Sequence, residues 1–276
     1  MALWQSVVLG IVQGLTEFLP VSSSGHLVLF QHLFGMKEPM LAFDVALHAG
    51  TLAALLVYFR KEVVAIVADF FSFLKKGSCS CASSTTPGDR PSGLWLMIFL
   101  TLIPTGVVAT LFKDYFESAF SDLASVGWQW IIMGAFLLLS VKIPGGTRKL
   151  GEIGWWRSLL IGFAQALALI PAISRSGSTI LAGMALGVKR EDAAKFSFLI
   201  SIPAIVAAVV LELRHGAVYF VSHEIAVLAG FFASALTGYL VIQWLMGVIQ
   251  RGRFSMFGYY CLLAGCVSFG VVYFLR

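Results

Sequence analysis

Long apolar stretches, separated by short polar connections, run along almost the whole chain. A transmembrane helix needs roughly 17 to 25 predominantly apolar residues, and six stretches meet this requirement. They predict six spanning helices, at residues 41–59, 94–112, 125–141, 196–213, 224–249 and 255–275. Uninterrupted apolar runs favour helices over the alternating strands of a membrane barrel.

Two further apolar regions are too short to cross a bilayer, and a proline interrupts each of them. Residues 2–35 break at Pro20, and residues 158–188 break at Pro171. Irregular backbone at membrane depth is tolerated only where protein or a wet cavity surrounds it. We therefore predict two re-entrant hairpins, each made of two half-helices whose connecting tip lies inside the membrane.

The second hairpin repeats the first. At an offset of 152 residues, six identities recur: Gly10, Gln13, Leu15, Ser22, Ser24 and Gly25 correspond to Gly162, Gln165, Leu167, Ser174, Ser176 and Gly177. Chance identity in apolar sequence is the alternative, but a hairpin followed by three spans occurs in both halves. We predict an all-α polytopic membrane protein with two repeats, residues 1–150 and 151–276, in one integrated membrane domain.

The distribution of basic residues predicts how this domain is oriented. A hairpin plus three spans reverses the membrane side, so the second repeat should have inverted topology. Connections on one side contain fourteen Lys or Arg residues, in segments 60–93, 142–157, 188–195 and 250–254, whereas the other side has only Lys37, Lys113, Arg214 and Arg276. The positive-inside rule places the basic side in the cytoplasm. The first hairpin then enters from outside, the second from the cytoplasm, and their tips meet near the midplane.

Composition excludes several other classes of protein. Hydrophobic residues make up 59% of the chain and charged residues 12%, against about 25% charged in soluble domains. The net charge of +5 comes from residues scattered among the connections, which does not indicate nucleic-acid binding. Two of the four cysteines lie in the polar segment 75–93, which we predict to be a flexible loop, and the other two lie in an apolar span. This distribution does not indicate a disulfide framework or a metal site made of cysteines.

Arg175 is the most informative single residue, because it falls at the tip of the second hairpin. A buried arginine in a bilayer is costly, by several kcal/mol or more, and indicates function by default. Its planar fork suits a phosphate or a carboxylate. A structural ion pair with Glu17 across the two tips is the alternative, and it is compatible with a functional role.

Hydroxyl side chains cluster where the second half-helix of each hairpin should begin, near Gly25 and Gly177. Isolated Ser and Thr in membrane helices usually bond backbone or neighbouring helices. Helix N-termini, however, expose free N–H groups and a positive dipole end. Two such termini beside Arg175 would form a pocket for a mono- or diphosphate, lined by Ser22, Ser23, Ser24, Ser174, Ser176 and Thr179.

Three other polar groups of the first hairpin have acid–base or ligand capacity. His26 could take a proton from a serine or from water, or could be a hydrogen-bonded packing residue. Glu17 could orient His26, hold Arg175 or bind a divalent ion, with Gln13 as a neutral oxygen ligand. Magnesium usually takes one or two carboxylates and completes its shell with phosphates and water. Asp44 and His48, one turn apart on a predicted span, are expected to bond each other.

Together these residues resemble the undecaprenyl-diphosphate phosphatases associated with bacitracin resistance. The matching motifs are Gln13-x-x-x-Glu17, Pro20-Val21-Ser22-Ser23-Ser24-Gly25-His26 and Ser174-Arg175-Ser176-x-x-Thr179. The resemblance extends over nearly the whole chain, including the order of hairpins and spans. It implies hydrolysis of undecaprenyl diphosphate to undecaprenyl phosphate and inorganic phosphate, which recycles the lipid carrier for peptidoglycan synthesis.

The resemblance also implies roles for individual residues. Ser23 would be the nucleophile and His26 its proton acceptor, with Glu17 as a further catalytic residue. The phosphate-binding residues would be Arg175, Ser174, Ser176 and Thr179, with Ser22 and Ser24 beside them. A divalent cation, Mg²⁺ or Ca²⁺, would bind Glu17 and Gln13. The family resemblance further implies a multi-pass bacterial inner-membrane enzyme, a site open to the periplasmic side, membrane-lipid contacts and a homodimer.

Two departures from the family pattern bear on the geometry. Gln13 stands where the family can have Glu, which removes one possible charged ligand. Ala172 follows the proline of the second motif where glycine is common, and a positive φ there would strain the turn. A secondary transporter or lipid flippase is the alternative function, because inverted repeats with broken helices also occur in transporters.

Overall fold

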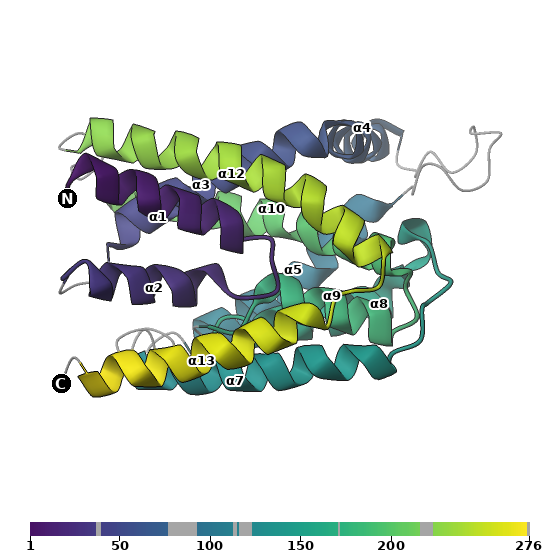
Figure 1. The fold of residues 1–276 in the computed structure, drawn as a ribbon. Helices are drawn as coiled ribbons and strands as arrows, with labels where there is room; N and C mark the ends of the chain where they lie inside the picture. Colours follow the sequence, from purple (N-terminus) through teal and green to yellow (C-terminus); the bar gives the residue numbers. More distant parts are fainter. Residues whose placement is uncertain are drawn as a thin grey trace.

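The computed structural model describes residues 1–36, 40–76, 93–112, 115, 123–170, 172–215 and 223–274. Regular structure in this part of the chain is helical, apart from one isolated parallel bridge between Arg148 and Val188. Most of the helices lie roughly side by side along one direction (Figure 1). The predicted loop 75–93 lies mostly outside the described residues.

Six helices of the described chain are long and apolar enough to cross a membrane. They are α3 (Leu41–Tyr58), α5 (Leu94–Leu111), α7 (Leu123–Leu139), α10 (Arg190–His215), α12 (Glu224–Gln250) and α13 (Met256–Phe274). The predicted spans are therefore confirmed. Helix α10 begins six residues before the predicted position, because Glu191 and Asp192 occupy its first turn, where acidic side chains stabilise the positive end of the helix dipole.

Four shorter helices form two pairs of matched length. Helices α1 (Leu3–Thr16) and α8 (Gly154–Leu167) have 14 residues each, whereas α2 (Ser23–Leu33) and α9 (Arg175–Ala185) have 11 each. At 1.5 Å per residue, the longer of these reach only about 21 Å, short of a hydrocarbon core of about 30 Å. Helix α1 ends inside the molecule, and α2 returns toward the end from which α1 came (Figure 1). Pro171 lies outside the described residues.

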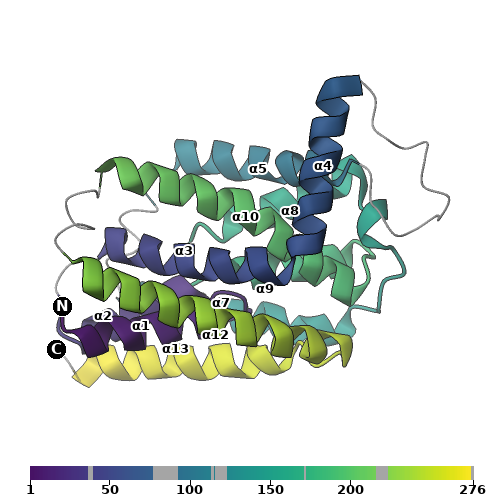
Figure 2. The same ribbon diagram turned by 90° about the horizontal axis from the view of Figure 1, so that it is seen from above.

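Helix α4 (Arg60–Lys76) follows the first spanning helix and ends where the predicted loop begins. It stands across the direction of the other helices (Figure 2). Two short 3₁₀ turns, η1 (Ser140–Lys142) and η2 (Leu150–Glu152), complete the connection between α7 and α8. The connections that follow α3, α7, α9 and α12 lie at one end of the molecule, and both termini lie at the other (Figure 1).

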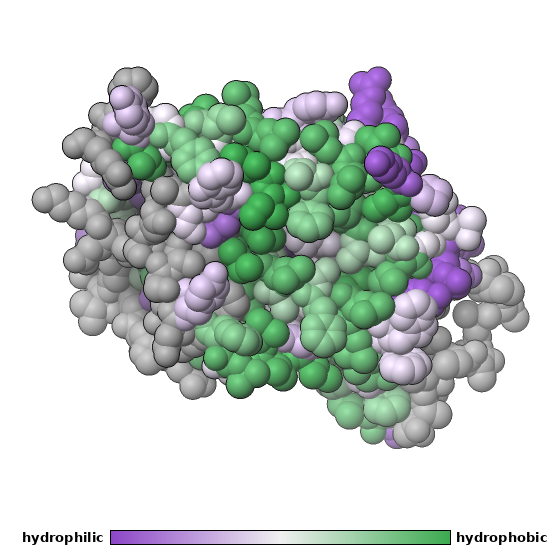
Figure 3. Space-filling view, turned by 90° about the horizontal axis from the view of Figure 1, so that it is seen from below, coloured by the Kyte–Doolittle hydropathy of each residue, from purple (hydrophilic) through white to green (hydrophobic). Residues whose placement is uncertain are grey.

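The surface is apolar around the middle of the molecule. Large side chains on it are well exposed, including Trp128, Phe136 and Phe232. Figure 3 shows a broad apolar region on one face, with hydrophilic side chains gathered mainly toward the end opposite the termini. Such a belt is what a lipid environment requires of the outward faces of spanning helices, so the chain is a multi-pass membrane protein.

The longer arm of each hairpin packs closely on a spanning helix from the other half of the sequence. Helix α1 lies along α12, and α8 lies along α5. A Cβ atom added to Gly10 would be 2.5 Å from the Gly230 carbonyl oxygen, and one added to Gly162 would be 2.5 Å from the Thr101 carbonyl oxygen. Small residues allow this approach of backbones, which drives helix association in lipid. The positions of both hairpins therefore depend on contacts between the two halves.

Gly10→Val should strongly destabilise the protein, because its side chain would meet backbone of α12 that cannot move aside. Gly106→Val is the matched control, since a Cβ atom there has nothing within 4 Å outside its own helix. We expect Gly10→Val to lower the thermal unfolding midpoint in detergent by several degrees more than Gly106→Val. Equal midpoints for the two variants would contradict close α1–α12 packing.

Candidate functional site

The turns of the two hairpins meet in the interior of the molecule. Ser174 and Ser176 each donate a hydrogen bond from Oγ to the Leu19 carbonyl, at 3.3 and 2.9 Å. Trp130 Nε1 donates to the Val21 carbonyl at 2.8 Å, and Trp130 is fully buried. Carbonyl groups of this turn therefore have partners, as irregular backbone at membrane depth requires.

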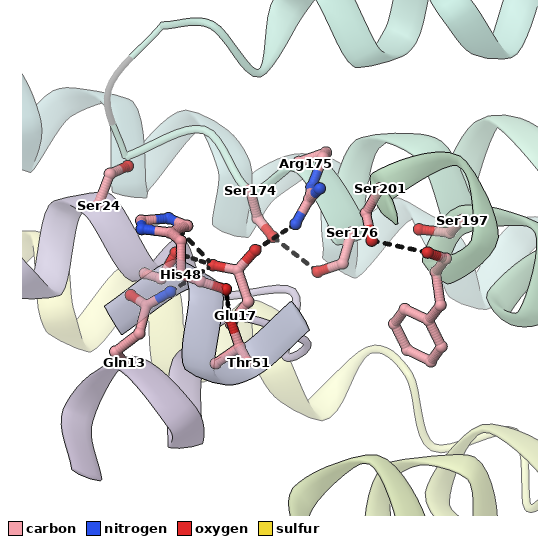
Figure 4. Close-up of polar contacts among 12 residues, drawn as sticks. Gln13, Glu17, Ser24, His48, Thr51, Ser174, Arg175, Ser176, Ser197 and Ser201 are labelled. Atoms are coloured by element: carbon pink, nitrogen blue, oxygen red, sulfur yellow. Dashed lines mark hydrogen bonds and ion pairs between the residues drawn. The ribbon is translucent and has the colours of Figure 1, made fainter. Parts of the chain in front are cut away.

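Glu17 is the centre of the polar contacts at this meeting point (Figure 4). Its Oε1 is bonded to Arg175 Nη2. Its Oε2 accepts hydrogen bonds from Ser23 Oγ at 2.7 Å and from Gln13 Nε2 at 2.9 Å. The Glu17 side chain is only 3% exposed, whereas that of Arg175 is 21% exposed. The predicted ion pair between the two tips is thus present, and its arginine is the more accessible partner.

The start of each second half-helix has the same side-chain capping contacts, although Ser22 has a positive φ and Ser174 is extended. Ser22 and Ser174 are the N-caps, and their Oγ atoms accept from Gly25 N at 3.4 Å and from Gly177 N at 3.1 Å. In each case a second hydroxyl two residues later lies close: the Oγ–Oγ distances are 3.2 Å for Ser22 with Ser24 and 3.1 Å for Ser174 with Ser176. Helices α2 and α9 begin two residues earlier than predicted, at Ser23 and Arg175. Both helix N-termini therefore open next to the ion pair.

His26 lies one turn after Ser23 on α2, with different partners. Its Nδ1 is 2.6 Å from the Ser22 carbonyl oxygen, which can only accept, so Nδ1 must carry a proton. In the neutral ring, Nε2 then accepts a hydrogen bond from the Tyr260 hydroxyl at 2.7 Å. Ser23 is bonded instead to Glu17. The Ser23 hydroxyl thus donates to the Glu17 carboxylate, and not to the His26 imidazole that we expected as its proton acceptor.

Thr179 is placed away from the Arg175 guanidinium group. Its hydroxyl contacts the Ser197 hydroxyl of α10 at 2.6 Å and donates to the Arg175 carbonyl at 2.8 Å. The residue is 1% exposed. These contacts connect α9 to α10, so Thr179 stabilises the first turn of α9 from its α10 side.

Asp44 and His48 do not bond each other through their side chains, contrary to expectation. The Asp44 carboxylate accepts from Gln31 Nε2 at 2.6 Å, while His48 Nδ1 bonds the Asp44 backbone carbonyl at 2.7 Å. His48 Nε2 instead faces Glu17 Oε2 at 3.5 Å. Spacing along one helix could not reveal this contact, because it depends on how α3 packs beside the first hairpin.

Sequence analysis also missed Tyr260 and Trp130. Tyr260 comes from α13, 234 positions after His26 in the chain, and Trp130 packs edge-on against His26 with ring centroids 4.9 Å apart. Both are aromatic residues in apolar spans, where such side chains usually face lipid or core. The presence of His26 in the first hairpin indicated that its ring nitrogens must have hydrogen-bond partners. The sequence did not indicate which residues those partners are.

Backbone strain occurs in both turns. Ser22 has φ of 65° and Ala172 has φ of 57°, a region that costs a side-chain-bearing residue about 1–3 kcal/mol. The predicted consequence of having alanine in place of glycine is therefore confirmed for Ala172. Ala172 is fully buried, so its surroundings hold the strained turn in place.

The site contains few groups suited to a metal ion. Within the described residues there is no cluster of three or more His, Cys, Asp or Glu side chains that could hold one. Glu17 is the carboxylate at the meeting point, and Gln13 Oε1 is buried there without a hydrogen-bond partner. This donor set fits a divalent ion only if a substrate and water supply its remaining ligands.

Fold and site together define a class: a multi-pass helical membrane protein in which an arginine, a carboxylate-bonded serine and two helix N-termini converge inside the molecule. Comparison with known proteins identifies the family. Residues 6–267 match the family model described as bacitracin resistance protein BacA, and the chain belongs to this family.

Curated relatives match over nearly their full lengths. A protein of Desulforapulum autotrophicum is 41% identical over 269 residues, covering 97% of this chain and 98% of the relative. One from Carboxydothermus hydrogenoformans is 40% identical, covering 95% and 94%, and one from Methanobrevibacter smithii is 39% identical, covering 96% of both. All three are named undecaprenyl-diphosphatase.

The buried pair of Glu17 and Arg175 should show strong energetic coupling. Removing one charge leaves the other uncompensated in the interior, at a cost of about 3–5 kcal/mol. We expect Glu17→Gln and Arg175→Gln each to lower the thermal midpoint in detergent, and the double variant to be more stable than the sum of the two changes predicts. Additive midpoint shifts would show that the two side chains are not coupled in the membrane protein.

Proposed function

We propose that this protein hydrolyses undecaprenyl diphosphate to undecaprenyl phosphate and inorganic phosphate. The observation that carries the proposal is the contact of Glu17 with both Ser23 and Arg175, because it joins a hydroxyl, a proton acceptor and a phosphate-binding cation at one carboxylate. The names of the curated relatives support the same reaction. They do not favour the alternative, a transporter or flippase.

Substrate binding would rearrange the ion pair. Arg175 is the more exposed partner, and its bidentate fork can move to the diphosphate. The N-termini of α2 and α9 would add N–H groups and dipoles to the phosphate site, with Ser24 and Ser176 at its rim. Loss of Arg175 from Oε1 would leave Glu17 free to accept the Ser23 proton. The substrate would thus activate the nucleophile by removing the cation that restrains its base.

In the first chemical step, Ser23 Oγ would form a bond to the terminal phosphorus as its proton passes to Glu17. The bond from that phosphorus to the bridging oxygen would break, and undecaprenyl phosphate would leave with the electron pair. Arg175 would stabilise the charge on the transferring phosphoryl group, which is the main contribution that proteins make to such reactions.

In the second step, water would attack the phosphoserine. The bond between phosphorus and Ser23 Oγ would break, and Oγ would recover its proton from Glu17. Tyr260 donates to His26 Nε2, so the water proton would pass to the Tyr260 oxygen while the Tyr260 proton moves to His26. We therefore assign His26 to this second step and Glu17 to the first.

A divalent cation, Mg²⁺ or Ca²⁺, would accompany the diphosphate. Glu17 Oε1, released by Arg175, and the unpaired amide oxygen of Gln13 would hold it, with substrate phosphates and water as the other ligands, while Oε2 would remain the proton acceptor for Ser23. When bound, the ion would neutralise negative charge on the phosphoryl oxygens.

An inverted repeat accounts for the matched hairpins. The N-cap contacts at Ser22 and Ser174 agree at an offset of 152 residues, as do the close backbone approaches at Gly10 and Gly162. In this scheme both hairpins are re-entrant and enter from opposite sides of the plasma membrane. The basic connections lie in the cytoplasm, and the site opens to the outer side, where it would recycle the lipid carrier for cell-wall synthesis and confer bacitracin resistance. The homodimer stays a prediction.

The proposal is tested by phosphate release from undecaprenyl diphosphate by purified protein in detergent, with Mg²⁺ or Ca²⁺ and with excess chelator. Arg175→Lys should lower kcat/KM by about 100-fold or more, because a point charge does not replace the bidentate fork. Arg60→Lys, at an exposed arginine outside both hairpins, is the matched control and should keep its rate. Absence of release by the wild type with either ion would refute the enzyme function.

Ser23→Ala should reduce turnover by at least about 1000-fold if this hydroxyl is the nucleophile, whereas Ser158→Ala, whose hydroxyl bonds the Gly154 carbonyl of its own helix, should retain most activity. A rapid quench with substrate labelled in its terminal phosphate should trap a labelled protein in the wild type. Substantial turnover by Ser23→Ala would instead show that water attacks phosphorus directly.

A further inference from the structure

A second concentration of positive charge lies far from the ion pair, at the end of the molecule opposite the termini. It is formed by three connections: 142–157, 187–195 and 250–254. They contain nine Lys or Arg residues and three Asp or Glu residues. None of these residues takes part in the proposed reaction, so their arrangement needs its own explanation.

Backbone contacts bring the three connections together. Arg148 N donates to the Gly187 carbonyl at 3.1 Å, and Lys189 N donates to the Arg148 carbonyl at 2.9 Å. The guanidinium group of Arg190 lies against the third connection, since a Cβ atom on Gly252 would be 3.3 Å from Arg190 Nη1. The arginines are therefore held by an ordered framework and are not on independent loops.

The acidic side chains nearby do not neutralise these arginines. Glu191 pairs with Lys195 at 3.0 Å, and Glu152 accepts from the Lys149 backbone N–H at 3.0 Å. Among the described residues, no carboxylate lies within ion-pair distance of Arg148, Arg157 or Arg190. The three connections thus carry several cations, and their positive charge is not balanced by the acidic residues among them.

Arg157 shows this excess most directly. Its guanidinium carbon lies over the Trp156 ring, 4.1 Å from the ring centroid, and Nη1 donates a hydrogen bond to the Ile153 carbonyl at 3.3 Å. Its Nε is buried without an acceptor. Partial burial, and then the positive charge of Arg148, lower the pKa of Arg157 from its usual value. An anion beside the two arginines would relieve this repulsion.

The surroundings indicate what kind of anion would bind. Trp155 is 62% exposed beside the cluster, and tryptophan concentrates at the headgroup level of membranes. Along the same helix, α8, Leu160 and Phe163 are exposed apolar side chains. A ligand with a phosphate head and acyl chains would meet both surfaces at once.

We propose that Arg148, Arg157 and Arg190 form a binding site for the phosphodiester headgroup of an anionic phospholipid. Guanidinium forks bind phosphate oxygens in pairs, and basic pockets beside membrane helices recognise acidic headgroups. The acyl chains lie along the apolar face of α8. The bound lipid holds the connections around α8 and α9 together, and so supports the second hairpin from the side opposite the proposed phosphatase site.

The test compares the double variant Arg148→Gln, Arg157→Gln with the control Arg60→Gln, Lys61→Gln, which removes two charges at the same end of the molecule but outside the cluster. Delipidated protein in detergent is titrated with phosphatidylglycerol or phosphatidylcholine, and native mass spectrometry counts bound lipid. We expect wild type and control to bind phosphatidylglycerol in preference to phosphatidylcholine and to gain several degrees in thermal midpoint. The cluster variant should bind roughly tenfold more weakly or worse, and should not gain.

Two further arms separate this site from other sources of the same chemistry. Arg175→Gln should keep the phosphatidylglycerol effect, since that arginine belongs to the phosphatase site; loss of the effect would assign the lipid to that site and overturn the proposal. Inorganic phosphate should not reproduce the stabilisation, and equal stabilisation would show a site for free phosphate. Equal lipid affinity in the cluster variant and the control would also overturn it. None of these measurements depends on hydrolysis.

Discussion

The contact between Glu17 and Arg175 is the interaction on which the site depends. Each group would be costly to bury alone, because neither water nor a counter-ion would compensate its charge. Together they fix the distance between two turns that are 158 residues apart in the chain. Ser23, Gln13 and His48 are then arranged around the same carboxylate. An ion pair of this kind gives modest net stability, but it specifies strongly which turn faces which.

Two irregular turns buried in the interior of the molecule require partners for their backbone groups. Side chains from several elements supply these: Trp130 bonds the Val21 carbonyl, and Ser174 and Ser176 bond that of Leu19. Close packing of α1 on α12 and of α8 on α5 positions the hairpins so that these side chains can meet. The site is therefore assembled by contacts that join the halves of the sequence, and the strained backbone at Ser22 and Ala172 persists because those contacts surround it.

The interior of the molecule and the end opposite the termini differ in how their charged groups are arranged. Both arrangements are governed by the cost of leaving a charge without a partner. Inside the molecule, charged groups are sparse, and the central pair of Glu17 and Arg175 compensate each other. At the end opposite the termini, Arg148, Arg157 and Arg190 have no carboxylate partner among the described residues. In water such a cluster would be screened by mobile ions, but at a membrane surface acidic headgroups are the nearest counter-charge. The two proposed phosphate-binding sites thus rest on different arrangements of charge.

The sequence alone determined the number and approximate positions of the spanning helices and the short hairpin arms, and it pointed to Arg175 as a buried charge that needs a partner, because hydrophobic length and the cost of burying charge are local properties. It also indicated the strain at Ala172. Only the tertiary structure decided which polar groups meet. Ser23 is bonded to Glu17 rather than to His26, His26 takes Tyr260 from the last helix, and His48 turns toward Glu17. Those pairings depend on how each helix is rotated and which helices it packs against. The apolar pattern of the spans does not reveal either, because the spans have similar compositions.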